Sequence, residues 1–164
     1  MEALRVGTSF DVHRLVDGRP LVLGGVEVPF ERGLAGHSDA DVLTHAVAGA
    51  LLGAAGMGDL GHHFPPGDAR WKDARSLDLL RRVVAMLDGA GWRVGNVDAT
   101  VICERPRLAP HVPAMRSALA GAMNVPAEAV NVKATTTEGL GATGRGEGIA
   151  AQAVALVAAR GAVS

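Results

Sequence analysis

Residues 38–52, SDADVLTHAVAGALL, form the segment that decides the fold, because they predict a helix between regions of strand pattern. Ser38 and Asp41 match the S-x-x-D pattern of a capping box, so the helix is expected to begin at Ser38. Apolar and imidazole side chains then recur at helical spacing and supply an inner face: Val42, His45, Ala46, Leu51 and Leu52.

The segments on either side alternate between strand and helix. Residues 4–11 predict a strand, and residues 20–23 and 26–29 predict a hairpin that turns at Gly24-Gly25. Residues 56–68 have loop composition, and they are followed by a predicted helix (about 73–90), strand (97–103), helix (113–123) and strand (130–136). Residues 149–159 fit either a helix or a strand. This order predicts an α/β two-layer fold whose sheet has one open face that needs cover.

Length and composition predict a single domain over residues 1–164. The chain is 48% hydrophobic and has one cysteine, so the core needs no disulfide framework. Only 3% of the residues are aromatic and the net charge is -1, which argues against a nucleic acid or an anionic membrane as partner. With no signal peptide pattern and no membrane span, we expect a cytoplasmic protein.

Two segments carry potential metal ligands. Asp11 and His13 lie two apart on a strand and therefore share a face, although a simple Asp–His hydrogen bond would explain them equally well. His45 lies one turn after Asp41, which could orient it, or His45 could be a packed core histidine. Taken together, Asp11, His13 and His45 offer three ligands with a fourth position open, as in catalytic zinc sites.

Two further segments have weaker patterns. His62 and His63 lie in a predicted flexible loop, so we interpret them as surface or pocket residues and not as ligands. Residues 133–148 place three consecutive threonines at a strand end, followed by many glycines, which suits a phosphate site. A dinucleotide fold is excluded, because only 20 residues follow Gly144. Since no nucleophile elbow is present, the chemistry should depend on positioning and charge neutralisation.

These motifs resemble the 2-C-methyl-D-erythritol 2,4-cyclodiphosphate synthase family of non-mevalonate isoprenoid precursor biosynthesis, essentially end to end. The specific segments are Phe10-Asp11-Val12-His13, His37-Ser38-Asp39 through His45, and residues 131–138 with 144–148. The resemblance implies a metal-dependent phosphorus–oxygen lyase. It would convert 4-diphosphocytidyl-2-C-methyl-D-erythritol 2-phosphate to the 2,4-cyclodiphosphate and release cytidine monophosphate.

The resemblance also implies roles for individual residues. Asp11, His13 and His45 would hold zinc or a similar divalent cation, and Glu138 would help to hold magnesium or manganese on the substrate diphosphate. His37 and Thr136 would stabilise the transition state. The remaining substrate contacts, besides those of Asp11, His13, His37, Thr136 and Glu138, would come from Ser38, Asp59, Gly61, Phe64, Pro65, Pro66, Gly67, Asp68, Cys103, Glu104, Arg105, Pro106, Arg107, Leu108, Ala109, Thr135, Thr137, Ala142 and Arg145.

For the assembly, the resemblance implies a homotrimer with sites between subunits, whose sheets face a central channel that an isoprenoid diphosphate could enter. Arg145 and Glu147 would lie near one end of this channel, and residues 149–159 would form a strand. The chain departs from the family pattern at Gly49, Pro66 and Ala142. Two other functions fit the same motifs: a zinc phosphohydrolase, and a non-catalytic carrier of isoprenoid diphosphates.

Overall fold

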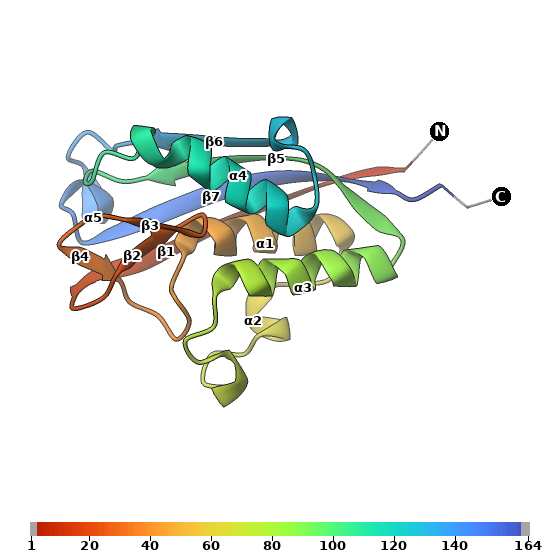
Figure 1. The fold of residues 1–164 in the computed structure, drawn as a ribbon, viewed down its shortest axis with the longest axis horizontal. Helices are drawn as coiled ribbons and strands as arrows, with labels where there is room; N and C mark the ends of the chain where they lie inside the picture. The colour runs from red at the N-terminus through yellow and green to blue at the C-terminus, as the bar shows by residue number, and fades with distance from the viewer. Residues whose placement is uncertain (1–2, 162–164) are drawn as a thin grey trace.

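The computed structural model describes residues 3–161 and contains a five-stranded mixed sheet covered on one face by three helices (Figure 1). The strands, in their order across the sheet, are β4 (Arg32–Leu34), β1 (Leu4–Asp17), β7 (Gly148–Ala159), β5 (Trp92–Ile102) and β6 (Val130–Thr135). β5 and β6 run parallel, and the other neighbouring pairs run antiparallel. The covering helices are α1 (Val42–Ala55), α3 (Ser76–Gly89) and α4 (Val112–Met123). The predicted α/β fold with a mixed sheet and helices on one face is confirmed.

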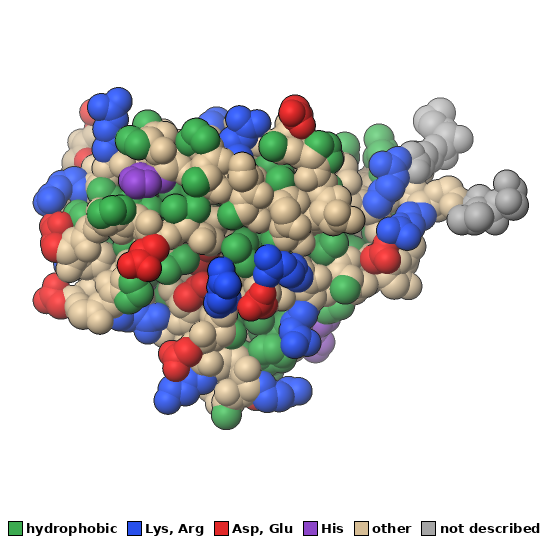
Figure 2. Space-filling view, in the orientation of Figure 1, with side chains coloured by type: hydrophobic (Ala, Val, Ile, Leu, Met, Phe, Trp, Pro, Cys, Tyr) green, Lys and Arg blue, Asp and Glu red, His purple; other side chains and the backbone are tan. Residues whose placement is uncertain are grey.

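The two faces of the sheet differ in exposure, because side chains alternate along each strand. Residues of β5 and β7 that point toward the helices are buried, among them Val97, Ala99, Ala153 and Ala155. On the opposite face, four residues in the first part of β1 are large, apolar and between 53% and 67% exposed: Leu4, Val6, Phe10 and Val12. The helix layer, by contrast, presents interspersed basic and acidic side chains to solvent (Figure 2).

Helix α1 is buried nearly all round and lies directly against β1. A Cβ atom on Gly7 of β1 would lie only 2.1 Å from the carbonyl oxygen of Ala50, so no side chain fits between strand and helix there. Gly49 makes a similar close approach to Ser9. Small residues therefore allow α1 to approach the sheet more closely than larger side chains would permit.

The predicted helix start at Ser38 is wrong, because α1 begins at Val42 with Asp41 as its N-cap. Ala40 has a positive φ of 57°, which is incompatible with a continuous helix through this segment. The carboxylate of Asp41 is fully buried and accepts hydrogen bonds from the backbone N–H groups of Gly24 and Gly25 and from both donors of Thr44. Asp41 thus joins the start of α1 to the hairpin turn.

The other predicted elements are present with shifted ends. The hairpin is formed by β2 (Leu21–Leu23) and β3 (Val26–Val28). Residues 149–159 lie within strand β7, since they pair with both β1 and β5. Two short helices were not predicted: α2 (Leu60–His63) lies within the expected loop, and α5 (Gly141–Gly144) lies in the glycine-rich segment. Among residues 3–161, no helix has the length and apolar character needed to cross a membrane.

Replacement of Asp41 by Asn tests the buried cap. Burial raises the pKa of Asp41, and its four hydrogen-bond donors all require an acceptor. A carboxamide offers an NH₂ group to at least one of these donors, so Asp41→Asn should lower the free energy of unfolding by about 2–3 kcal/mol. Urea denaturation measures this change. The exposed variant Asp88→Asn is the control and should change it by less than about 0.5 kcal/mol; equal effects would contradict the role of the cap.

Candidate active site

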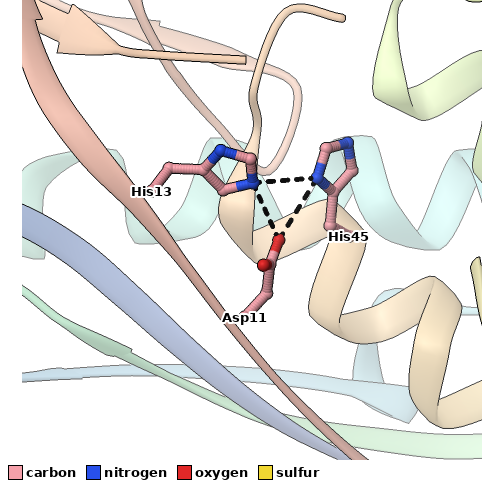
Figure 3. A group of neighbouring side chains, drawn as sticks. All are labelled: Asp11, His13 and His45. Carbon is pink, nitrogen blue, oxygen red and sulfur yellow. Dashed lines mark hydrogen bonds and ion pairs between the residues drawn. The ribbon is translucent and has the colours of Figure 1, made fainter. Parts of the chain in front are cut away.

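Three side chains from β1 and α1 converge at one point (Figure 3). Asp11 and His13 project from the same face of β1, and His45 projects from the first turn of α1. The Oδ2 atom of Asp11 lies 2.9 Å from Nε2 of His13 and 3.3 Å from Nδ1 of His45. The two ring nitrogens are 3.3 Å apart. All three side chains are partly buried, so the point at which they meet is partly shielded from solvent.

Each ring forms a hydrogen bond through its outer nitrogen, and this bond determines which of the two nitrogens faces the meeting point. Nδ1 of His13 lies 2.7 Å from the carbonyl oxygen of Ala35, which can only accept, so Nδ1 carries the hydrogen. Nε2 of His13 is thus the nitrogen that faces Asp11 and His45, and it offers a lone pair once its proton is displaced by a cation. On His45, Nε2 lies 2.9 Å from the hydroxyl oxygen of Ser76, and Nδ1 faces the cluster.

The electrostatics of the cluster favour an anionic Asp11. Burial raises the pKa of Asp11, but hydrogen bonds and charge attraction from His13 and His45 outweigh it and hold the pKa well below its usual range. Burial lowers the pKa of His13, whereas its hydrogen bond with Asp11 raises it, and the net pKa is above the ordinary value. A site that attracts protons in this way also attracts a metal cation.

The ligand set fits a divalent metal. Asp11, His13 and His45 each offer one ligand atom, and these atoms lie within 4.8 Å of one another. One carboxylate oxygen and two imidazole nitrogens are ligands that zinc accepts, and three protein ligands leave a position for a substrate. The prediction that these residues form a group that could hold a metal is confirmed. Asp41, however, does not orient His45, since its carboxylate is bound to the hairpin turn and to Thr44.

A cavity of about 170 Å³ lies beside the cluster, with mainly apolar walls. Its lining includes several predicted substrate contacts: His37, Ser38, Gly61, Phe64, Pro65 and Pro66. It also includes Trp71 and Leu79, which the sequence analysis missed because neither lies in a recognisable motif. Asp59 lines an adjoining groove that reaches Asp11, and there its side chain also caps α2.

Other predicted residues lie near this cavity without lining it. The backbone carbonyl of Asp68 is 3.0 Å from Nε2 of His37, whereas the Asp68 carboxylate forms an exposed ion pair with Arg70. Gly67 is also outside the lining. His62 and His63 are not members of the metal group; Nε2 of His63 lies 2.7 Å from the carbonyl oxygen of Met57.

A second cavity, of about 450 Å³, lies at the ends of β5 and β6. Its lining is residues 103–109, which the sequence analysis names as substrate contacts, together with three residues of β6 and its end: Cys103, Glu104, Arg105, Pro106, Arg107, Leu108, Ala109, Ala134, Thr135 and Thr136. Burial raises the pKa of the Cys103 thiol to about 11, which makes it a poor nucleophile. The Glu104 carboxylate accepts hydrogen bonds from the N–H groups of Thr137 and Gly139 and so fixes the loop after β6.

The remaining predicted residues lie in this loop or just after it. Glu138 is exposed, has a positive φ of 53°, and donates its backbone N–H to the hydroxyl of Thr136. Ala142 lies in α5, and Arg145 forms an exposed ion pair with Glu147.

Within one chain, the two cavities are separate. β1 carries Asp11 and His13, whereas Thr136 follows β6, and β7 and β5 lie between these strands. Three strand spacings correspond to about 14 Å. The structure therefore does not bring Thr136 or Glu138 to the metal group of the same chain.

Comparison with known proteins is consistent along the whole chain. The model of the YgbB family matches residues 4–158. The chain is 64% identical over 154 residues to the 2-C-methyl-D-erythritol 2,4-cyclodiphosphate synthase of Salinibacter ruber, covering 94% of this chain and 98% of that protein.

Solved structures agree with this result. The bifunctional IspDF of Campylobacter jejuni matches with a TM-score of 0.93 and 38% identity, over 97% of this chain and 43% of that longer chain. A 2C-methyl-D-erythritol-2,4-cyclodiphosphate synthase in its CDP-bound form matches with a TM-score of 0.85 and 37% identity, over 93% of this chain and 99% of that chain. The chain therefore belongs to the YgbB family.

Proposed function

We propose that this chain catalyses cyclisation of 4-diphosphocytidyl-2-C-methyl-D-erythritol 2-phosphate to the 2,4-cyclodiphosphate, with release of cytidine monophosphate. The reaction makes it a phosphorus–oxygen lyase of isoprenoid precursor biosynthesis. The observation that carries the proposal is the group of Asp11, His13 and His45 beside a cavity, in a chain 64% identical to a synthase of that name.

The proposed metal at this group is zinc, because the ligands are one carboxylate and two imidazoles. Bound there, it would neutralise charge on a diphosphate oxygen as the reaction proceeds. A second cation, magnesium or manganese, is proposed to be held with help from Glu138, and it would neutralise charge on the substrate phosphates. The carboxylate of Glu138 is exposed near the end of β6, which is consistent with a ligand that completes a site on another subunit.

The substrate is proposed to span both cavities. The methylerythritol unit would occupy the cavity of His37, Ser38 and Phe64, and the cytidine would occupy the cavity of residues 103–109. A cytidine nucleotide is supported by the solved synthase with bound CDP, which shares 37% identity with this chain.

The chemistry requires little from acid–base groups. An oxygen of the 2-phosphate attacks the β-phosphorus, a new P–O bond forms, and the bond to the cytidine monophosphate oxygen breaks. Since the attacking phosphate is already anionic, no base is needed. The protein holds the reacting groups in line, and the hydroxyl of Thr136 and the ring of His37 donate to oxygens that gain charge.

A homotrimer is proposed as the active form. Within one chain, β7 and β5 lie between the strand of the metal group and the strand that leads to Thr136, so a neighbouring chain is proposed to supply the second cavity. The exposed apolar residues of β1 offer a surface for such contact, so that three sheets would face a central channel. An isoprenoid diphosphate could occupy this channel, with Arg145 near one end.

Replacement of His45 by Ala tests the metal site. His45→Ala removes one of three ligands, so zinc content should fall from about one per chain to nearly none, since removing a ligand from a three-ligand site abolishes tight binding. The far-UV circular dichroism should stay unchanged, because leucines and alanines provide the core contacts of α1. Mass spectrometry of the native protein measures the zinc, with His62→Ala as the control that should retain it. Full zinc occupancy in His45→Ala would rule out this site.

Replacement of Thr136 by Ala tests the cyclisation step. Loss of one preorganised donor should lower kcat by about a hundredfold, or about 3 kcal/mol, while KM and zinc content change little. Release of cytidine monophosphate gives the rate, and phosphorus NMR identifies the second product. A rise in KM alone would make Thr136 a binding residue only. An open-chain diphosphate from the wild-type protein would indicate hydrolysis and overturn the proposed reaction.

Mixed trimers test whether subunits share the site. His45→Ala and Thr136→Ala should each be nearly inactive, but chains unfolded and reassembled together in equal amounts should regain roughly one quarter of wild-type activity. This fraction follows because random assembly places an intact metal half against an intact Thr136 at one site in four. Each variant reassembled alone is the control. If the site lies within one chain, the mixture will remain as inactive as its components.

A further inference from the structure

A buried polar network lies on the side of His45 that faces away from Asp11 and His13. Figure 3 shows that the far nitrogen of His45 points away from the cluster. This nitrogen, Nε2, lies 2.9 Å from Oγ of Ser76, and the same oxygen is hydrogen-bonded to Oδ1 of Asp39. We infer that Ser76 and Asp39 are positioning residues that fix the tautomer and orientation of His45 as a metal ligand, an inference that rests on the proposed metal site.

The hydrogen positions in this network have one arrangement. A carboxylate can only accept, so the Ser76 hydroxyl donates its single hydrogen to Asp39. The Ser76 oxygen is then left as an acceptor toward His45, and Nε2 of His45 must donate to it. In the neutral ring that would bind a cation, Nδ1 consequently carries no hydrogen, and its lone pair is directed to the point where Asp11 and His13 meet.

Ser76 and Asp39 are themselves held in place. Ser76 is the first residue of α3 and is 1% exposed. The preceding residue, Arg75, gives α3 no side-chain cap, and Asp39 Oδ2 instead accepts the backbone N–H of Ser76 at 2.9 Å. The N–H of Asp41 also donates to Asp39 Oδ1. The network therefore joins the start of α3, the segment before α1 and the ring of His45.

Ser38 provides a matched comparison, because its hydroxyl is also near Nε2 of His45. Its Oγ lies 3.3 Å from this nitrogen and accepts the N–H of Ala40. Among residues 3–161, no carboxylate is hydrogen-bonded to the hydroxyl of Ser38 in the way that Asp39 is bonded to Ser76. Ser76 should consequently have the larger effect on His45.

The network has a chemical consequence for the metal. A hydrogen-bonded acceptor on the outer nitrogen orients a ligating histidine and increases its basicity, and removal of such a partner typically weakens metal binding by about 10–100-fold. The carboxylate of Asp39 strengthens the acceptor, because it polarises the Ser76 hydroxyl.

The first test measures zinc affinity of the full chain by competition with a chromophoric chelator. Ser76→Ala should raise the zinc dissociation constant by about tenfold or more, because it removes the hydroxyl but keeps the backbone N–H bond to Asp39. Ser38→Ala should raise it by less than about threefold. Circular dichroism of the metal-free variants checks that both are folded. A folded Ser76→Ala protein with wild-type zinc affinity would overturn the inference.

The second test needs no variant. In the zinc-loaded wild-type protein labelled with ¹⁵N-histidine, NMR should show the Nε2 proton of His45 protected from exchange with solvent, because it is donated to the buried oxygen of Ser76. This measurement decides the matter if Ser76→Ala does not fold, and an Nε2 proton that exchanges as fast as that of an exposed histidine would exclude the network. The results distinguish failure of the proposed metal site from failure of the proposed network. A wild-type protein that binds no zinc contradicts both proposals. Equal zinc affinity of wild type and Ser76→Ala contradicts only the network.

Discussion

The close approach of α1 to β1 is the constraint on which the rest of the structure depends. At Gly7 the strand has no room for a side chain, because a Cβ atom there would lie 2.1 Å from the backbone of α1. The alanines and glycines of α1 continue this contact along the helix. A larger residue would move the helix outward, and His45 would lose its position beside Asp11 and His13. Tight backbone packing thus sets the geometry of the polar site.

The polar site shows how a protein presents two histidines to one point. Each ring has one nitrogen bound to a group in the fold, Ala35 for His13 and Ser76 for His45, and the other nitrogen is directed inward. The inward nitrogens both face Asp11, and in the metal-free cluster hydrogen bonds and charge attraction from the two rings hold the pKa of Asp11 low. The ligand atoms are therefore oriented before any cation arrives, which reduces the entropy lost on binding.

The sheet has two functions in this arrangement. Its helix-covered face contributes the metal ligands of β1, and the end of β6 contributes the loop of Thr136 on the far side of two intervening strands. Its other face exposes a row of large apolar side chains on β1. In the trimer that we propose, contact through this face would bury the apolar row and bring the two kinds of cavity together. The same strands would then provide both assembly and catalysis.

The sequence by itself determined the features that depend on local spacing. Alternation along strands placed Asp11 and His13 on one face, helical spacing placed His45 on the inner side of α1, and the motifs around these residues indicated the family. Residues 149–159 were ambiguous, because an alanine-rich segment suits a helix locally and becomes a strand only when β1 and β5 pair with it. Local pattern cannot report such long-range pairing.

Tertiary structure alone decided which distant hydrogen-bond donors the carboxylates of Asp39 and Asp41 bind. The S-x-x-D pattern predicted a helix from Ser38, but Asp41 is bound to the turn at Gly24-Gly25, and Asp39 is bound to Ser76. These partners are 16 to 37 residues away in the chain, and no local motif marks them. A carboxylate's role is set by the donors that the completed fold brings within about 3 Å, because a hydrogen bond forms only at that range.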